Sequence, residues 1–271
     1  MNPYITDPTR IPATDRFAAE PLHVMSTTSE GLAYLASVLD LCDTSVRIYE
    51  NPDGGRDVFA LGGVIVKSSH LNYHIELTRD YSYADANEVA ATAIARAALQ
   101  GIRVSQIFFA SKLNGQAVLV QERIPGVGLN VAWDYLSPAQ EVSFKQQTRE
   151  LLRQMHKVHP LAGCTARSYV VPDPDPIIHA SDKIDPDMSF MHNDFSLSNT
   201  IVYDDRIVGL VDWEMAGFFG WEMAGFFGWK TAAEVHAKLR TPQAGNYAHL
   251  GLPAQQLADI LFWNDLYEIE P

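Results

Sequence analysis

Short apolar runs separated by polar turns recur in the first half of the chain and again near residue 200. The first runs predict strands over residues 45–50, 57–61, 64–67 and 118–124. Gly62-Gly63, between the second and third runs, is a hairpin signal. Two further strands, at residues 200–203 and 207–211, are predicted on either side of the polar turn Asp204–Arg206.

Longer segments of helical character predict helices over residues 29–41, 85–100, 137–156 and 253–269. Ser137 supplies a cap and Pro138 a first-turn residue for the third of these helices. The start of the second helix admits two interpretations. Asp85-x-x-Glu88 matches a capping box that satisfies the helix end. Glu88 also matches a glutamate that pairs with a lysine on a preceding strand.

The densest chemistry lies around the later pair of strands, between residues 190 and 214. His192-x-Asp194 is followed by four residues and Asn199, and the second strand ends on Asp212. Phosphoryl transfer depends on positioning and charge neutralisation, and this order of residues suits it. Asp194 is placed to take a proton from an acceptor hydroxyl, and the oxygens of Asn199 and Asp212 suit a magnesium ion.

The alternative for this loop is ordinary turn chemistry, because Asp, Asn and Ser are common turn formers. His192 is predicted to be a hydrogen-bonded anchor of the loop and not an acid or base. The ordered set of loop, strand, turn, strand and Asp212 favours the catalytic interpretation over the turn.

A nucleotide site in a kinase-like fold needs a lysine on a strand and a glutamate on the next helix. Lys67 at the end of the third strand and Glu88 are the candidates, although a solvated lysine at a strand end would look the same. The backbone of residues 121–124, including Glu122 and Ile124, would face the adenine. A plain boundary between strand and turn would give the same pattern there.

These motifs resemble those of the aminoglycoside phosphotransferase and choline kinase-like family, which includes fungal phosphotransferase-family proteins. The likeness spans roughly residues 58–267, and the segments that carry it are 64–67, 121–126, 153–156, 192–199 and 211–214. The family usually has glycine where this chain has Asn193.

The resemblance implies a two-lobed, protein kinase-like α+β fold, with a small antiparallel-sheet N-lobe and a mainly helical C-lobe. It also implies ATP as the donor and Mg²⁺ as the metal. By motif match Asp194 would be the catalytic base and Asn199 and Asp212 the metal ligands. Lys67 and Glu88 would form the pair that binds the nucleotide phosphates.

Residues 1–28 are rich in Pro, Thr and Asp, and we expect them to be irregular. We further expect a nucleotide-binding N-lobe at 29–123 and a C-lobe at 124–271. The C-lobe would hold the catalytic loop, the metal-binding Asp212 and the acceptor site. The predicted function is ATP- and Mg²⁺-dependent transfer of the γ-phosphoryl group to a hydroxyl of a small molecule. Two alternatives are a kinase-fold enzyme repurposed for non-phosphoryl chemistry and an inactive nucleotide-binding pseudokinase.

The octapeptide Trp-Glu-Met-Ala-Gly-Phe-Phe-Gly occurs twice in tandem, at residues 213–220 and 221–228. Eight residues is too short for a repeat architecture, so a local duplication is the simpler interpretation. We expect the extra copy to bulge near the acceptor site. It would be a tolerated loop, or its aromatic residues would reshape the pocket, form a contact surface or spoil catalysis.

Composition narrows the partners and the compartment. The net charge of −13 argues against nucleic acids and anionic membranes as partners. Two cysteines make no disulfide framework, and no apolar run is long enough to span a bilayer, so we expect a cytoplasmic protein. The acidic segment 172–187 is either a solvated loop or an attraction for a cationic acceptor.

Overall fold

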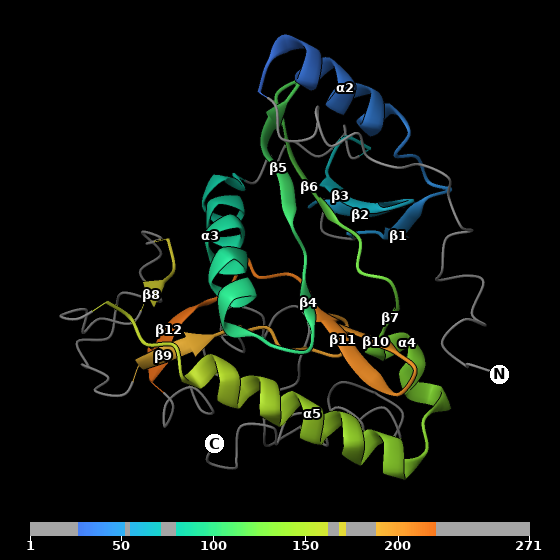
Figure 1. Cartoon of the computed structure of the whole chain (residues 1–271). Helices are drawn as coiled ribbons and strands as arrows, with labels where there is room; N and C mark the ends of the chain where they lie inside the picture. Colours follow the sequence, from blue (N-terminus) through green and yellow to red (C-terminus); the bar gives the residue numbers. More distant parts are fainter. Residues whose placement is uncertain (1–26, 52–54, 72–79, 162–167, 172–187, 221–271) are drawn as a thin grey trace, which may run out of the picture.

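The computed structural model of the chain describes residues 27–51, 55–71, 80–161, 168–171 and 188–220 (Figure 1). Four segments predicted from the sequence lie outside the described residues: the irregular segment 1–28 except for its last two residues, the acidic segment 172–187, the second octapeptide and the expected helix 253–269.

The first lobe is built on a five-stranded antiparallel sheet with the order β1-β2-β3-β6-β5. Its strands are β1 (Arg47–Tyr49), β2 (Asp57–Leu61), β3 (Val64–Ser68), β5 (Ile107–Leu113) and β6 (Gln116–Glu122). The β2–β3 hairpin turns at Gly62-Gly63 as predicted. The β5–β6 hairpin turns at Asn114-Gly115, where both residues have positive φ. Strand β5 is absent from the strands predicted above.

Helix α2 (Ser29–Asp40) packs against this sheet and closes the core of the first lobe (Figure 1). Its buried Leu35 and Val38 join Phe59, Val66 and Val120 of the strands in one apolar cluster. The helix begins where the side chain of Thr28 accepts a hydrogen bond from the Gly31 N–H.

Helix α3 (Ser82–Ala98) contacts β5 of the first lobe and reaches α5 of the second (Figure 1). It begins three residues before the predicted start, and Tyr81 is the cap. Asp85 and Glu88 therefore lie inside the helix, and the capping-box interpretation is wrong. The helix buries polar residues on one face, namely Asp85, Asn87, Glu88 and Thr92.

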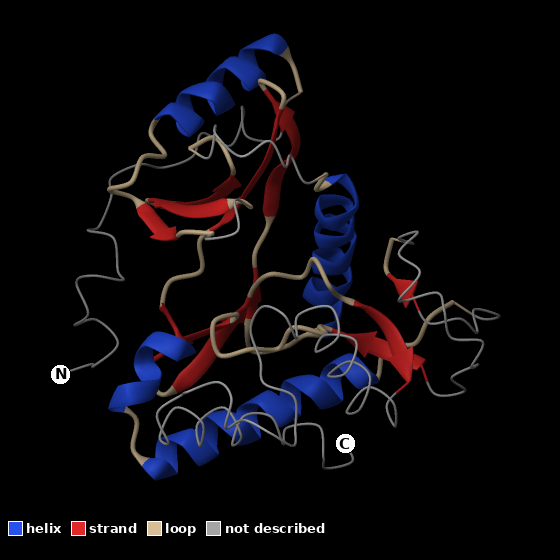
Figure 2. Ribbon diagram, turned by 180° about the vertical axis from the view of Figure 1, so that it is seen from behind, coloured by secondary structure: helices blue, strands red, loops and turns tan. Residues whose placement is uncertain are grey.

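The second lobe carries two small sheets above a long helix (Figure 2). The sheets have the orders β4-β11-β10-β7 and β8-β12-β9. Their strands are β4 (Arg103–Val104), β7 (Val127–Gly128), β8 (Ser168–Tyr169), β9 (Met188–Met191), β10 (Thr200–Tyr203), β11 (Arg206–Leu210) and β12 (Gly217–Gly220). The helical elements are α4 (Leu129–Ala132), the 3₁₀ turn η2 (Trp133–Tyr135) and α5 (Pro138–His156).

Helix α5 has the bounds that the sequence predicted, and Ser137 and Gln140 form a complete capping box at its start. Its apolar face supplies Phe144, Leu152 and Met155 to the larger core, which also contains the fully buried Trp213.

The chain enters the second lobe twice. Strand β4 comes from the predicted N-lobe range but pairs in parallel with β11, Arg103 opposite Gly209. The chain then returns to the first sheet and enters the second lobe again after Ile124, whose side chain is buried and lies close to Gly209. The domain ranges given above stay a prediction.

The structure has the predicted two-lobed, kinase-like α+β fold. The first lobe has an antiparallel sheet with a lysine on β3 and a helix that faces it, and a linker follows β6. The second lobe holds the loop and the hairpin. This fold class is confirmed. None of the helices in the described ranges is both long and apolar enough to cross a membrane.

Candidate functional site

The loop after β9 is anchored by His192, as predicted. The His192 ring is fully buried, its Nε2 lies 3.0 Å from the Val211 carbonyl oxygen, and its Nδ1 accepts the Asp194 N–H at 3.2 Å. The carbonyl has no proton to donate, so Nε2 carries the ring proton. Burial lowers the pKa of His192 to about 4. The ring is therefore neutral near pH 7 and acts as a structural tie.

Asn193 occupies the position where the family usually has glycine, and it takes over the backbone role of glycine. Its φ is 63°, in the left-handed region that asparagine tolerates better than most residues. Its side chain also donates a 2.8 Å hydrogen bond from Nδ2 to the Met215 carbonyl. Asn193 thus ties the loop to the segment after Asp212.

Asp194 and Asn199, at the two ends of the loop, are joined by hydrogen bonds. Asn199 Nδ2 donates to the backbone oxygen and to Oδ2 of Asp194, both at 2.9 Å. The Asn199 carbonyl in turn accepts the Val211 N–H at 3.0 Å. The β10–β11 hairpin therefore places the backbone of Asn199 beside Val211, the residue before Asp212, and metal binding by these two side chains stays a prediction.

Lys67 lies at the centre of a buried ionic cluster. Its Nζ is 2.9 and 2.8 Å from the two carboxylate oxygens of Glu88, and 2.8 Å from Oδ1 of Asp212. The side chains of Lys67 and Glu88 are 10% and 0% exposed, so this is no solvated surface lysine. The structure brings the predicted pair together and joins it to Asp212, 145 residues further along the chain.

A second cation, Arg56, supports the cluster from the end of the β1–β2 connection. Its guanidinium donates to the Asp85 carboxylate, lies 3.6 Å from Glu214 and sits 4.1 Å above the Tyr81 ring. Two cations, Lys67 and Arg56, thus face four carboxylates, those of Asp85, Glu88, Asp212 and Glu214.

This excess of negative charge shows in the ionisation of the cluster. Burial opposes the charge on Lys67, but Asp212 and Glu88 outweigh it and raise its pKa above the usual value. Burial also opposes the charge on Glu88 and raises its pKa to about 7. The attraction of Lys67 lowers this pKa, and the negative charges of Asp212 and Glu214 raise it. A divalent cation would relieve this imbalance.

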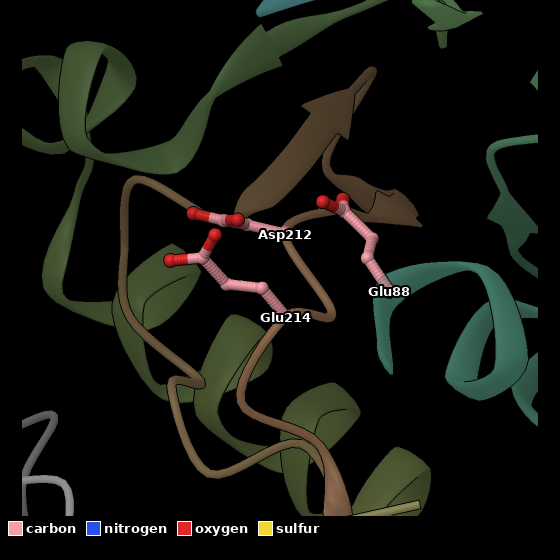
Figure 3. A group of neighbouring side chains, drawn as sticks. All are labelled: Glu88, Asp212 and Glu214. Carbon is pink, nitrogen blue, oxygen red and sulfur yellow. The ribbon is translucent and has the colours of Figure 1, made fainter. Parts of the chain in front are cut away.

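Glu88, Asp212 and Glu214 have carboxylate oxygens within 4.8 Å of one another, close enough for one cation to bridge them (Figure 3). Oxygen donors of this kind suit hard cations such as Mg²⁺. Glu214 is a ligand candidate that the motif reasoning missed, and its spacing of two residues from Asp212 was the available signal. Arg56 was also missed, because nothing local marks it as buried.

Two backbone N–H groups at the end of β6, where the chain leaves the first lobe, bind within that lobe. The Glu122 N–H donates to the Gln106 carbonyl at 2.8 Å, and the Arg123 N–H donates to the Gly63 carbonyl at 2.9 Å. The adenine contact expected at Glu122 and Ile124 stays a prediction.

Residues 176–219 match the model of the phosphotransferase enzyme family, and this confirms the resemblance over the segment that holds the loop, the hairpin and Asp212. No curated protein matches the chain significantly.

Solved structures that are partly similar to this chain include three phosphotransferases. A streptomycin–ATP complex of APH(2″)-IIa is 12% identical, covers 72% of this chain and 73% of its own, and has a TM-score of 0.47. ADP-bound APH(2″)-Ib is 10% identical with coverage of 89% and 99% and a TM-score of 0.47. The macrolide 2′-phosphotransferase MphH from Brachybacterium faecium is 16% identical with coverage of 87% and 98% and a TM-score of 0.46.

Proposed function

We propose that this chain is an ATP- and Mg²⁺-dependent phosphotransferase that moves the γ-phosphoryl group to a hydroxyl of a small molecule. The observation that supports it best is the buried contact of Lys67 with both Glu88 and Asp212, beside the loop of Asp194 and Asn199. A lysine held by a helix glutamate and an aspartate that follows a hairpin is the arrangement that kinase-like phosphoryl transfer uses.

The donor set fits the proposed metal. Asp212 and Glu214 offer carboxylate oxygens. The Nδ2 of Asn199 binds Asp194, so the amide oxygen of Asn199 can face a cation. When bound, Mg²⁺ would neutralise the charge of the phosphates and orient the γ-phosphoryl group. Lys67 would then bind phosphate oxygens while Glu88 holds it in place.

Asp194 would act on the acceptor. Its carboxylate, partly exposed and oriented by Asn199, would accept the proton of the acceptor hydroxyl as the oxygen attacks phosphorus. One oxygen–phosphorus bond forms to the acceptor, and the bond from the γ-phosphorus to the bridging oxygen of ADP breaks. The products are ADP and a phosphate monoester, and the proton stays on Asp194 until it leaves to solvent.

A cationic acceptor suits the charge of the protein. The chain carries a net charge of −13, and a negative field attracts positively charged ligands. Two of the solved phosphotransferase structures are complexes with the aminoglycosides streptomycin and gentamicin, which contain amino sugars. We therefore propose amino sugars or choline-like alcohols as the first acceptors to test.

The test is an ATP-dependent transfer assay with a panel of aminoglycosides, a macrolide and choline, read out by ADP release and the mass of the product. We expect Asp194→Asn to lower kcat by roughly 10²–10⁴-fold, and we expect Asp212→Asn or metal chelation to abolish transfer. Asp204→Asn is the control, because this exposed turn residue has a left-handed φ of 50° that asparagine also accepts.

Two results would contradict the proposal. Product formed without ATP would point to non-phosphoryl chemistry in the same pocket. ATP binding with no transfer to any acceptor, equal in wild type and Asp194→Asn, would point to a nucleotide-binding protein without catalysis.

A further inference from the structure

Asn87 on α3 is buried, with an exposed fraction of 2%, and its side-chain amide forms hydrogen bonds with three backbone groups. Its Nδ2 donates to the carbonyls of Glu214 at 2.9 Å and Ala216 at 2.8 Å. Its Oδ1 accepts the Val171 N–H at 2.8 Å. All of these partners are far away in the sequence, so the side chain serves tertiary structure and not the helix that carries it.

The segment held by Asn87 has no regular structure of its own. Residues 211–216 lie between β11 and β12 and belong to neither strand, so their carbonyls depend on other partners. Asn87 binds those of Glu214 and Ala216, and Asn193 of the catalytic loop binds that of Met215. Three consecutive carbonyls are therefore held by two asparagine side chains.

The same turn of α3 reaches the candidate cation site by a second route. Glu88, the next residue, binds Lys67, which binds Asp212. Asn87 fixes the backbone of Glu214, and Glu88 supplies one of the carboxylates that lie within 4.8 Å of each other. The helix thereby sets both sides of the carboxylate cluster.

We infer that Asn87 is a positioning residue for the divalent cation: it locks α3 to the backbone after Asp212 and so keeps Asp212 and Glu214 at ligand spacing beside the Lys67–Glu88 pair. This inference rests on the proposed function, in which these carboxylates serve a metal–nucleotide complex. It assigns Asn87 no contact with substrate. Its consequence is that losing the amide weakens cation binding even though every candidate ligand is still present.

The experiment measures Mn²⁺ affinity by calorimetry, with and without ATP, in wild type, Asn87→Ala, Asn87→Asp and Asn87→Ser. Partners that orient metal ligands typically contribute about 10–100-fold to metal affinity, so we expect a loss of that order for alanine and a smaller loss for serine. Thr92→Val is the matched control, because Thr92 is buried on the same helix but its hydroxyl binds only helix carbonyls. This control should bind Mn²⁺ like wild type.

The aspartate variant separates positioning from charge. It keeps the shape of the side chain and the acceptor for Val171, but it has no donors for the two carbonyls. An added negative charge alone would tighten cation binding, whereas lost positioning weakens it. We expect weaker binding, and tighter binding by Asn87→Asp would overturn the inference.

A second readout is coupling with Glu214. If Asn87 acts through this residue, the loss of Mn²⁺ affinity in Asn87→Ala should shrink in a Glu214→Ala background, because neighbouring effects are not additive. Full additivity, or wild-type affinity in all three Asn87 variants, overturns the inference while leaving the proposed function standing. If the wild-type chain binds Mn²⁺ neither alone nor with ATP, the proposed function is contradicted. The inference about Asn87 then fails with it, because it depends on a cation at these carboxylates.

Discussion

The charge of Lys67 is compensated by two carboxylates, and this makes the side chain as important for folding as for the proposed chemistry. Lys67→Met would leave Glu88 buried without its 2.8 Å partner, and breaking a buried pair in this way typically costs about 3–5 kcal/mol. Urea denaturation should show this loss. The double variant Lys67→Met/Glu88→Leu should recover most of it, because neither charge then remains in the interior.

The cost of Lys67→Met should also grow with pH. Without the lysine the pKa of Glu88, already raised to about 7 by burial, rises further above its unfolded value. A group of this kind stabilises the fold below its unfolded pKa, and the stability is lost as pH rises through the folded pKa. Equal losses at pH 5.5 and pH 8 would contradict this account.

His192 should give the stability of the wild type the opposite dependence on pH. Burial lowers its folded pKa to about 4, while an unfolded histidine titrates near about 6.5. Above pH 6.5 the residue is neutral in both states. As the pH falls from 6.5 to 4 only the unfolded chain gains the proton, so stability should fall by about 3 kcal/mol at most.

The measurement for His192 is urea unfolding at several pH values, compared with His192→Gln. The glutamine variant lacks the titration, so the difference between the two curves isolates this ring from the carboxylates that titrate in the same range. A constant difference between pH 7 and pH 4.5 would show that His192 is not the source.

Residue spacing in the sequence predicted Lys67, Glu88, Asn199 and Asp212 because each lies in or directly beside a predicted strand or near the predicted start of a helix. The structure brings these residues together. Arg56 could not be found in this way: it follows a glycine-rich turn, and only its distant partners Asp85 and Tyr81 show that it is buried.

At the scale of elements, local signals predicted α5 well because its start is determined locally. Ser137 accepts the Gln140 N–H, and the Gln140 side chain accepts the Ser137 N–H at 2.9 Å. Ser137→Ala should cost about 1 kcal/mol in thermal or urea unfolding. Ser143→Ala, at an exposed position inside the same helix, is the control and should cost less, because it removes only an exposed 3.3 Å hydrogen bond from Gln147. Equal effects at the two positions would mean that the capping box does not stabilise the helix.

The start of α3 was misplaced for the complementary reason. The sequence offered Asp85-x-x-Glu88 as a helix start, but these acids bind Arg56 and Lys67 of the first lobe. A local pattern cannot tell a cap from a residue with a distant partner. The two-residue β4 could not be predicted either, because it is defined by parallel pairing with β11, which is distant in the sequence.

At the scale of the molecule, the first octapeptide is part of the core and not an appendage. Trp213, Ala216 and Phe219 are buried, and β12 pairs with β8 and β9. Removing either copy gives the same polypeptide, so one deletion tests whether a single copy suffices. We expect this variant to keep its fold, with a small change in Tm because loop length has only a weak entropic effect. Unfolding of the shortened chain would refute this.

Which copy the sheet uses can be tested without a deletion, because the duplication provides two phenylalanines in identical local sequence. Phe219 is 2% exposed and packs edge-on against Tyr169, whereas Phe227 is its counterpart in the second copy. If the strand pairs only through the first copy, Phe219→Ala should cost about 3–5 kcal/mol and Phe227→Ala much less. If the chain can shift by eight residues and pair through the second copy, both variants should show similar, small losses. Urea unfolding of the two variants decides between a unique register and an exchangeable one, because the two substitutions remove the same side chain and differ only in the copy of the octapeptide that carries it.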